Sequence, residues 1–248
     1  MQIPLLEDDT DQPGILEPAE LYRPNGAPPR AVMCFFNEVV EYAGGTLHAR
    51  FTSQEHRPVY TTTRNGVEIA YFYPGIGAPS ASISMEEAIV MGCRDFVAVG
   101  GAGALLPELK LGEVLIADQA LRDEGTSYHY LEASSRFVSA DEVVNAAIAQ
   151  ALQAAGVPYR RGTTWTTDAI FREPRSRLER RVLEGCSTVE MEAAAFFAVA
   201  QYRGVRVGQL LYAGDALAGD KWDSRDWMQA TDVRTALFEV ALDAASRL

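Results

Sequence analysis

The segment 186–223 constrains the fold more than any other part of this 248-residue chain. It has the pattern of a strand, a helix beginning near Glu192 that is apolar on nearly all sides, and a second strand over 205–213. A helix without a polar face is buried. Carboxylates stand at both ends of this apolar stretch, since Glu190 and Glu192 open the helix and Asp215 follows the second strand. Ligands of open α/β sheets bind at the carboxyl ends of strands, so these acids lie where a binding site is expected.

Strands and helices alternate along the rest of the chain, which predicts a single α/β domain over 31–248 with a mixed, mostly parallel central sheet flanked by helices. Residues 1–30 hold six prolines and predict an extended arm, either a frayed tail or a segment that packs on a neighbouring subunit. Asn65-Gly66 predicts a hairpin over 59–73. The remaining strands are expected at 31–36, 94–99, 113–120 and 160–167, and the remaining helices at 80–91, 140–155, 174–184 and 230–248.

The net charge of −12 and the absence of a basic stripe argue against a nucleic-acid partner. An anionic substrate would then need a local cluster of donors. The three cysteines, Cys34, Cys93 and Cys186, lack metal-ligand spacing and are expected to be buried free thiols. No apolar run approaches the ~20 residues that span a membrane, and no signal peptide precedes the arm. We therefore expect a cytoplasmic protein with no membrane partner.

Three stretches at expected strand ends are suited to ligand binding. The glycine-rich stretch 100–104 reads as a loop with almost no side chains, where a ligand could approach the backbone. The stretches 122–130 and 168–173 combine polar and aromatic residues. The glycine spacing does not match the dinucleotide fingerprint and Pro107 prevents a helix from opening there, so no nicotinamide cofactor is expected.

Five motifs in order resemble the nucleoside phosphorylase superfamily, which includes uridine phosphorylases and purine nucleoside phosphorylases. The resemblance runs from about residue 30 to the C-terminus. The matching stretches are Gly75-Ile76-Gly77-Ala78-Pro79-Ser80, Gly100-Gly101-Ala102-Gly103-Ala104, Arg122-Asp123-Glu124-Gly125-Thr126-Ser127, Thr167-Asp168-Ala169-Ile170-Phe171 and Val189-Glu190-Met191-Glu192-Ala193.

The resemblance implies cleavage of the N-glycosidic bond of a nucleoside. Glu190, Met191 and Glu192 would bind the ribose, and Glu192 would stabilise an oxocarbenium-like transition state. Asp215 matches the acid that protonates the base in the purine-cleaving branch, which favours a purine over uridine. The alternatives are an ordinary acidic helix start for the two glutamates and a structural turn aspartate for Asp215.

The base would contact the region around the fourth motif. Asp168 would order the loop or support the base pocket, and Phe171 and Trp165 would stack on the base. Arg172 lies near the position where the uridine branch places an arginine and is a further candidate for base binding. The glutamine of that branch is missing. The segment 218–227 would either close over the base as a lid or form a solvated loop anchored by Trp222.

The phosphate end departs from the family pattern. The first strand ends in Phe35-Phe36 where the family has a Gly-Asp pair, and Gly101 replaces a loop hydroxyl. The remaining candidates for phosphate binding are Arg57, which would act across a subunit interface, Arg122, and backbone N–H groups around Gly101 and Ala102 that would form an anion-binding nest.

The expected activity is therefore a nucleoside phosphorylase, a pentosyltransferase with inorganic phosphate as co-substrate and no other cofactor or metal. The alternatives are a nucleosidase that uses water and a non-catalytic nucleoside-binding protein. By the same resemblance the protein is expected to form a homodimer or a hexamer built as a trimer of dimers.

Overall fold

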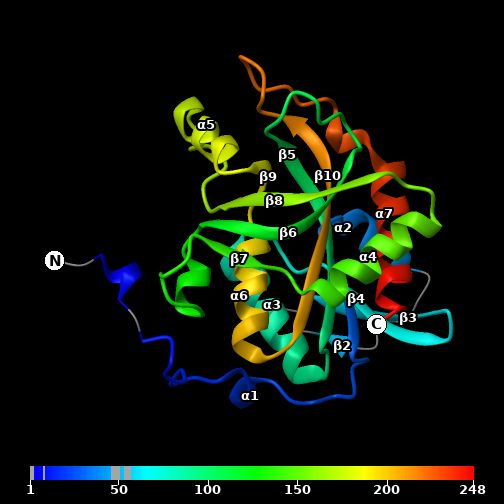
Figure 1. Cartoon of the computed structure of the whole chain (residues 1–248). Coiled ribbons are helices and arrows are strands. Elements are labelled where there is room, and N and C mark those ends of the chain that lie inside the picture. The colour runs from blue at the N-terminus through cyan, green and yellow to red at the C-terminus, as the bar shows by residue number, and fades with distance from the viewer. Residues whose placement is uncertain (1–2, 8, 46–50, 53–56) are drawn as a thin grey trace.

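The computed structural model describes residues 3–7, 9–45, 51–52 and 57–248 (Figure 1). Within these residues the sheet has the strand order β10-β6-β8-β9-β5-β1-β4-β3-β2, and β7 pairs with β6. The strands are β1 Arg30–Cys34, β2 Phe51–Thr52, β3 Pro58–Arg64, β4 Val67–Phe72, β5 Asp95–Ala104, β6 Val114–Asp123, β7 Phe137–Ser139, β8 Tyr159–Thr167, β9 Cys186–Glu190 and β10 Arg206–Ala216. The α-helices are α1 Pro18–Leu21, α2 Asn37–Gly45, α3 Ala78–Met91, α4 Glu142–Ala154, α5 Arg175–Leu183, α6 Ala193–Arg203 and α7 Thr231–Ala245.

The sheet is mixed, as the sequence predicts. The pairings β4-β1-β5-β10 are parallel, whereas β10 pairs with β6 and β5 pairs with β9 in antiparallel register. Because β10 bonds to both β5 and β6, the strands β5, β10, β6, β8 and β9 close into a ring. The carboxyl ends of β5, β8, β9 and β10 therefore converge at one end of the molecule.

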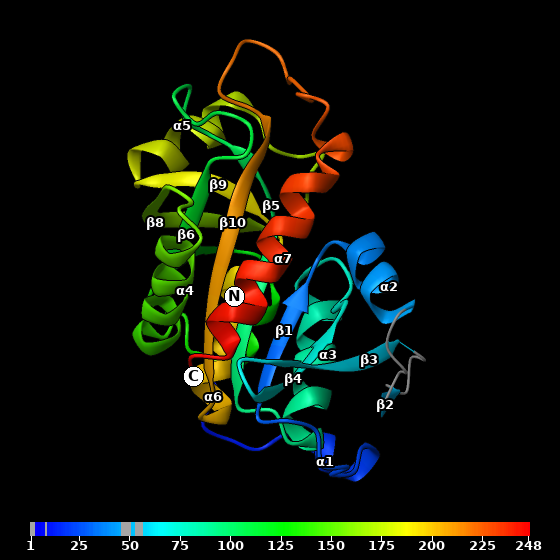
Figure 2. The ribbon, with the colours of Figure 1, turned by 90° about the vertical axis from the view of Figure 1, so that its right-hand side faces the viewer.

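Helices cover both faces of the sheet. On one face α3 and α6 pack together, with α6 also against β6 and β10, and on the other α4 and α7 pack together over β10, β5 and β1 (Figures 1 and 2). The expectation for the helix after Glu192 is confirmed, since every residue of α6 from Ala193 to Ala200 is buried. Its N-terminus is thereby held at the end of β9.

Local signals predicted their elements well. Asn65 and Gly66 both have positive φ, 51° and 77°, and join β3 to β4 as the sequence predicts. Asp141 caps α4 by accepting hydrogen bonds from the N–H groups of Val143 and Val144. The three cysteines are free and buried, as expected.

The expected glycine loop at 100–104 is wrong. These residues are the second half of β5, because Gly100, Gly101 and Ala102 pair with β10 and Gly103 pairs with Val189 of β9. An anion-binding nest needs successive N–H groups in a turn conformation. Here the backbone is extended and none of these three glycines has a positive φ, so the predicted nest is not formed.

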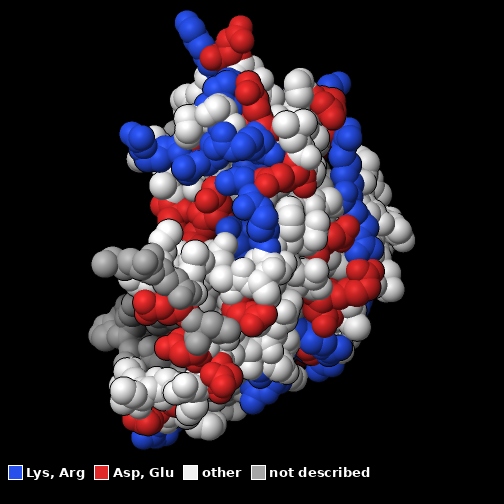
Figure 3. All heavy atoms as spheres, turned by 60° about the vertical axis from the view of Figure 1, so that its left-hand side comes forward, with Lys and Arg blue, Asp and Glu red and all other residues white. Residues whose placement is uncertain are grey.

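The surface carries both signs of charge. On the face shown in Figure 3, Lys and Arg side chains gather in the upper part, at the height of α5, whose exposed arginines are Arg175 and Arg180. Acidic side chains are scattered in separate groups over the rest of that face. Among the described residues, no helix combines the length and the apolar composition that crossing a membrane requires.

Candidate active site

A cleft opens where the carboxyl ends of β5, β8, β9 and β10 meet, and it has two lobes that share a wall. The tryptophan lobe has a volume of about 490 Å³ and the glycine lobe about 500 Å³. Both lobes are lined by Gly103, Ile170, Val189, Glu190, Met191, Asp215 and Trp227. The tryptophan lobe adds Thr167, Phe171, Glu173, Leu217 and Trp222, and the glycine lobe adds Phe35, Phe36, Glu38, Ile76, Gly100, Gly101, Ala102, Glu192, Gln209, Gly214, Met228 and Arg234.

Glu190 holds the start of α6. One of its carboxylate oxygens accepts from the Thr166 hydroxyl at 2.6 Å, and the other accepts from the N–H groups of Glu192 at 2.7 Å and Ala193 at 2.6 Å. It therefore satisfies two of the free donors that every helix N-terminus leaves. Burial raises the pKa of Glu190 although these hydrogen bonds act in the opposite direction.

Glu192 lies directly beside this cap and is 6% exposed. Its Oε1 accepts from the Gly77 N–H at 2.6 Å, which ties it to the loop before α3. Burial raises the pKa of Glu192, and the charge of Glu190 raises it further.

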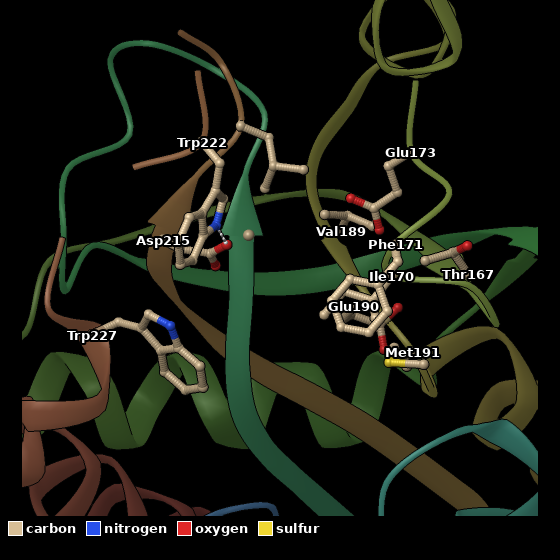
Figure 4. Close-up of a pocket in the computed structure, with 12 residues that line it drawn as sticks. Thr167, Ile170, Phe171, Glu173, Val189, Glu190, Met191, Asp215, Trp222 and Trp227 are labelled. Atoms are coloured by element: carbon tan, nitrogen blue, oxygen red, sulfur yellow. Dashed lines mark hydrogen bonds between the residues drawn. The ribbon is translucent and has the colours of Figure 1, made fainter. Parts of the chain in front are cut away.

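Asp215 lies near the end of β10, on the opposite side of the tryptophan lobe from Phe171 (Figure 4). The Trp222 indole N–H donates to its Oδ2 at 2.6 Å. Trp227 lines the same side of the lobe, so two indoles flank the carboxylate (Figure 4). The loop 217–222 is held in place because Ala216 and Asp223 exchange backbone hydrogen bonds.

Glu173 was not predicted as a site residue, yet it lines the tryptophan lobe across from Asp215 (Figure 4). Its side chain makes no hydrogen bond or ion pair with any residue that the structure describes. Burial, and then the charge of Asp215, raise the pKa of Glu173 to about 7. No local pattern marks this residue, because its environment is created by β9 and β10.

The glycine lobe is crowded by aromatic rings. A Cβ placed on Gly100 would lie 3.2 Å from the Phe35 ring, and one on Gly101 would lie 3.0 Å from the Tyr212 ring. Gln209 is buried in the same lobe, and its Oε1 has no hydrogen-bond partner among the described residues. The glycines are therefore needed for close approach of these side chains.

Arg234 is the cationic residue that lines the glycine lobe, and its donors are already engaged. Its guanidinium donates to Glu38 at 2.5 Å, to the Trp227 carbonyl at 2.8 Å and to the Tyr212 hydroxyl at 3.3 Å. Only 8% of its surface is exposed. The charge of Glu38 therefore offsets the positive charge at this end of the cleft.

Arg122, Trp165, Asp168 and Arg172 do not line the cleft. Arg122 is buried and donates to the Ser127 hydroxyl and to backbone carbonyls of residues 131–135, so it orders that loop. Trp165 is fully buried and donates to Asp123. Asp168 is exposed and accepts from the Gly125 N–H at 2.8 Å, and Arg172 is also exposed.

Arg57 also lies outside both lobes. Its guanidinium donates to the Pro74 carbonyl at 2.6 Å, to the Ser80 hydroxyl at 3.0 Å and to the Ser84 hydroxyl at 3.2 Å. It thus braces the loop whose Gly77 holds Glu192. Of the other expected residues, Met191 and Phe171 line the cleft, as do Gly101 and Ala102 of β5.

The sequence of this chain is similar to the sequences of several nucleoside phosphorylases. The chain is 33% identical over 168 residues to a uridine phosphorylase of Thermococcus kodakarensis, which covers 62% of this chain and 60% of that protein. It is 29% identical to a DeoD-type purine nucleoside phosphorylase of Myxococcus xanthus over 85% of this chain and 92% of the relative. A guanosine phosphorylase of Halorubrum lacusprofundi is 27% identical over 77% of this chain and 80% of the relative. The match thus spans less than two thirds of the first of these relatives and most of the other two.

Solved structures share the fold. A uridine phosphorylase of Vibrio fischeri superposes with a TM-score of 0.78 at 22% identity, covering 92% of this chain and 98% of the other. A purine nucleoside phosphorylase of Toxoplasma gondii gives 0.78 at 20% identity, covering 89% and 91%. The family model described as the phosphorylase superfamily matches residues 29–246. The chain therefore belongs to the phosphorylase superfamily, as its motifs predicted.

Proposed function

We propose that the protein is a nucleoside phosphorylase that cleaves the N-glycosidic bond of a purine nucleoside, giving free base and ribose 1-phosphate. The observation that carries this proposal is the pair of opposed acidic groups in one cleft. The buried Glu190–Glu192 pair lies on one side, and Asp215, flanked by Trp222 and Trp227, lies on the other. A nucleoside placed between them would present its sugar to the glutamates and its base to the indoles.

The glutamates suit the sugar. Departure of the base leaves an oxocarbenium-like sugar, and a carboxylate at van der Waals distance stabilises that charge. The Gly77 N–H bonds to Oε1 of Glu192, and the second carboxylate oxygen would accept from ribose hydroxyls. Glu190 has both oxygens engaged in the cap of α6, so its part is to hold Glu192 in place.

The tryptophan lobe suits the base. Its walls combine flat indole and phenyl rings with carboxyl groups, which would stack on a heterocycle and bond to its polar edge. A base leaves more readily when a carboxyl group protonates a ring nitrogen. Asp215 is the acid that the family resemblance implies for this task, and its position favours a purine. The relatives named above include uridine, purine and guanosine phosphorylases.

Hydrolysis is the second candidate, and the glycine lobe is the reason. A phosphate dianion entering there would meet Glu38 and an arginine whose donors are engaged. The Oε1 of Gln209, which has no partner among the described residues, is an acceptor that a water molecule could satisfy. Water as nucleophile would give free ribose.

The deciding experiment measures cleavage of a nucleoside panel with and without inorganic phosphate. We expect phosphate-dependent release of base with formation of ribose 1-phosphate, faster for purine nucleosides than for uridine. Equal rates without phosphate and free ribose as product would establish the nucleosidase. No cleavage of any nucleoside, together with saturable nucleoside binding, would overturn both and leave a binding protein.

We also propose that the chain forms a homo-oligomer. The arm exposes Ile15 completely and Leu16 by 60%, and Ile76 at the cleft is 66% exposed. Apolar side chains at these positions would be covered by a second copy. Light scattering at several protein concentrations tests this directly.

A further inference from the structure

The tryptophan lobe contains a carboxyl group that no motif and no expected contact accounts for. Glu173 is half-buried, lies across the lobe from Asp215 and has no hydrogen-bond partner among the described residues (Figure 4). Glu173 therefore keeps some contact with solvent while it lines the lobe. The charge of Arg177 lowers the pKa of Glu173 by less than burial and Asp215 raise it, and these two side chains form no ion pair.

The backbone holds Glu173 in this place. The following residue is Pro174, which restricts Glu173 to an extended conformation and caps α5. Next, Arg175 donates to the carbonyls of Leu217 and Gly219. The segment that carries Glu173 is thereby hydrogen-bonded to the loop that carries Trp222. The carboxyl groups of Glu173 and Asp215 therefore face each other from two segments that are joined.

The two carboxyl groups are not equivalent. Asp215 accepts the indole N–H of Trp222 at 2.6 Å, so one of its oxygens is engaged. Glu173 has no such donor, faces the charge of Asp215 and shares the lobe with Glu190. Two carboxylates in one site do not both ionise readily, and the unsupported one keeps its proton.

We propose that Glu173 is a second catalytic carboxyl group in the tryptophan lobe. Glu173 presents a proton to the leaving base, and Asp215 presents a negative charge. Asp215 accepts an N–H of the base, and Glu173 donates its proton to a ring nitrogen. This rests on the proposed nucleoside cleavage and names a proton donor other than the one the family resemblance implies.

Atoms and charges balance in the proposed cleavage step. The bond from C1′ to the base nitrogen breaks and its electron pair stays on the base. The Glu173 proton moves to a base ring nitrogen, so a neutral base leaves. An oxygen of phosphate, or of water, supplies the electron pair of the new C1′–O bond, and if water attacks, its proton passes to solvent. Glu173 regains a proton from solvent.

The raised pKa of Glu173 sets the direction in which turnover changes with pH. The pKa of Glu173 is raised to about 7 by burial and by Asp215, so the protonated form is present below that pH and is lost above it. The turnover of a natural nucleoside should therefore fall as the pH rises above about 7. The groups that face Glu173 are Asp215 from β10, Arg177 from α5 and Glu190 from β9.

The test compares Glu173→Gln with the wild type on two substrates over pH 5–9. One is the best nucleoside of the panel, and the other is a nitrophenyl riboside, whose leaving group departs without a proton. We expect Glu173→Gln to lower nucleoside turnover by about 10²-fold, within the usual range for a general acid, and to lose the fall above pH 7. Turnover of the nitrophenyl riboside should stay within about threefold of the wild type.

Glu179→Gln is the matched control, because Glu179 is exposed on α5 and the charge change is the same. It should leave both substrates unaffected. A wild-type rate and an unchanged pH profile for Glu173→Gln would overturn the proposal, and so would an equal loss on both substrates, which indicates a role in positioning. If the wild type cleaves neither substrate, the proposed function fails instead, so the two failures are distinguishable.

Discussion

The two lobes of the cleft have similar volumes but handle their polar groups in opposite ways. In the tryptophan lobe, Glu173 has no partner among the described residues and Asp215 has a single donor, Trp222. In the glycine lobe, Arg234 is engaged by Glu38, Tyr212 and the Trp227 carbonyl. One lobe thus keeps reactive groups available, whereas the other has its charge neutralised.

This difference bears on the proposed reaction, because the two lobes would serve its two substrates differently. The proposed leaving-group and sugar chemistry needs carboxyl groups that face the substrate, and carboxyl groups line both lobes of the cleft. Binding a phosphate dianion needs donors that remain free, and the glycine lobe offers few. Three substitutions test this contrast between the tryptophan lobe and the glycine lobe, in order of decreasing expected effect.

Replacing Glu192 with alanine should have the largest effect. It removes the carboxylate that stabilises the positive sugar, and we expect kcat/KM for nucleosides to fall by about 10³-fold, at the upper end for one electrostatic group. Steady-state kinetics measures the loss. Urea unfolding should show stability close to the wild type, since the substitution removes the carboxylate partner of the Gly77 N–H and no ion pair.

Glu190→Gln is the contrasting control. Glu190 accepts three hydrogen bonds at the start of α6, so its substitution should lower the free energy of unfolding by about 1–3 kcal/mol. Unchanged turnover in Glu192→Ala would remove the assignment of this side of the cleft to the sugar.

Asp215→Asn should have the next largest effect. The variant keeps the size of the side chain but removes the charge opposite Glu173, so the carboxyl pair loses its asymmetry. We expect turnover of purine nucleosides to fall by about 10²-fold, with little change for a pyrimidine substrate. Parallel kinetics on a purine nucleoside and on uridine would measure both. Equal losses on both would argue that Asp215 holds the loop of Trp222 rather than the base.

Much of this arrangement could be predicted from local sequence. The turn at Asn65-Gly66 and the cap at Asp141 depend on residues close in the chain, and both are found where predicted. The segment of α6 is apolar on nearly all sides, and this pattern likewise predicted that the helix is buried. The acids Glu192 and Asp215 were identified because carboxylates next to buried elements are unusual in a sequence.

The rest depends on contacts between distant segments. The stretch 100–104 has loop composition, but pairing with β10 and β9 extends it as a strand. Glu173 looks like an ordinary loop acid, and only the approach of β10 places it opposite Asp215. Arg122 sits in a family motif, yet five nearby residues engage it in the loop that follows β6. Pairing and burial of this kind are not visible in a window of sequence.

The smallest expected effect concerns the glycine lobe. In Glu38→Gln, Arg234 keeps its bonds to Tyr212 and Trp227 but loses the carboxylate that offsets its charge. A phosphate ion in this lobe would then be bound more tightly, and we expect its KM to fall by about threefold, the size of one partly exposed charge interaction. Glu41→Gln, an exposed change on the same helix, is the control and should leave this KM unchanged. The measurement is the phosphate dependence of nucleoside cleavage at fixed ionic strength. A higher or unchanged KM in Glu38→Gln would show that phosphate does not approach this guanidinium, and the contrast between the lobes would then favour water as the nucleophile.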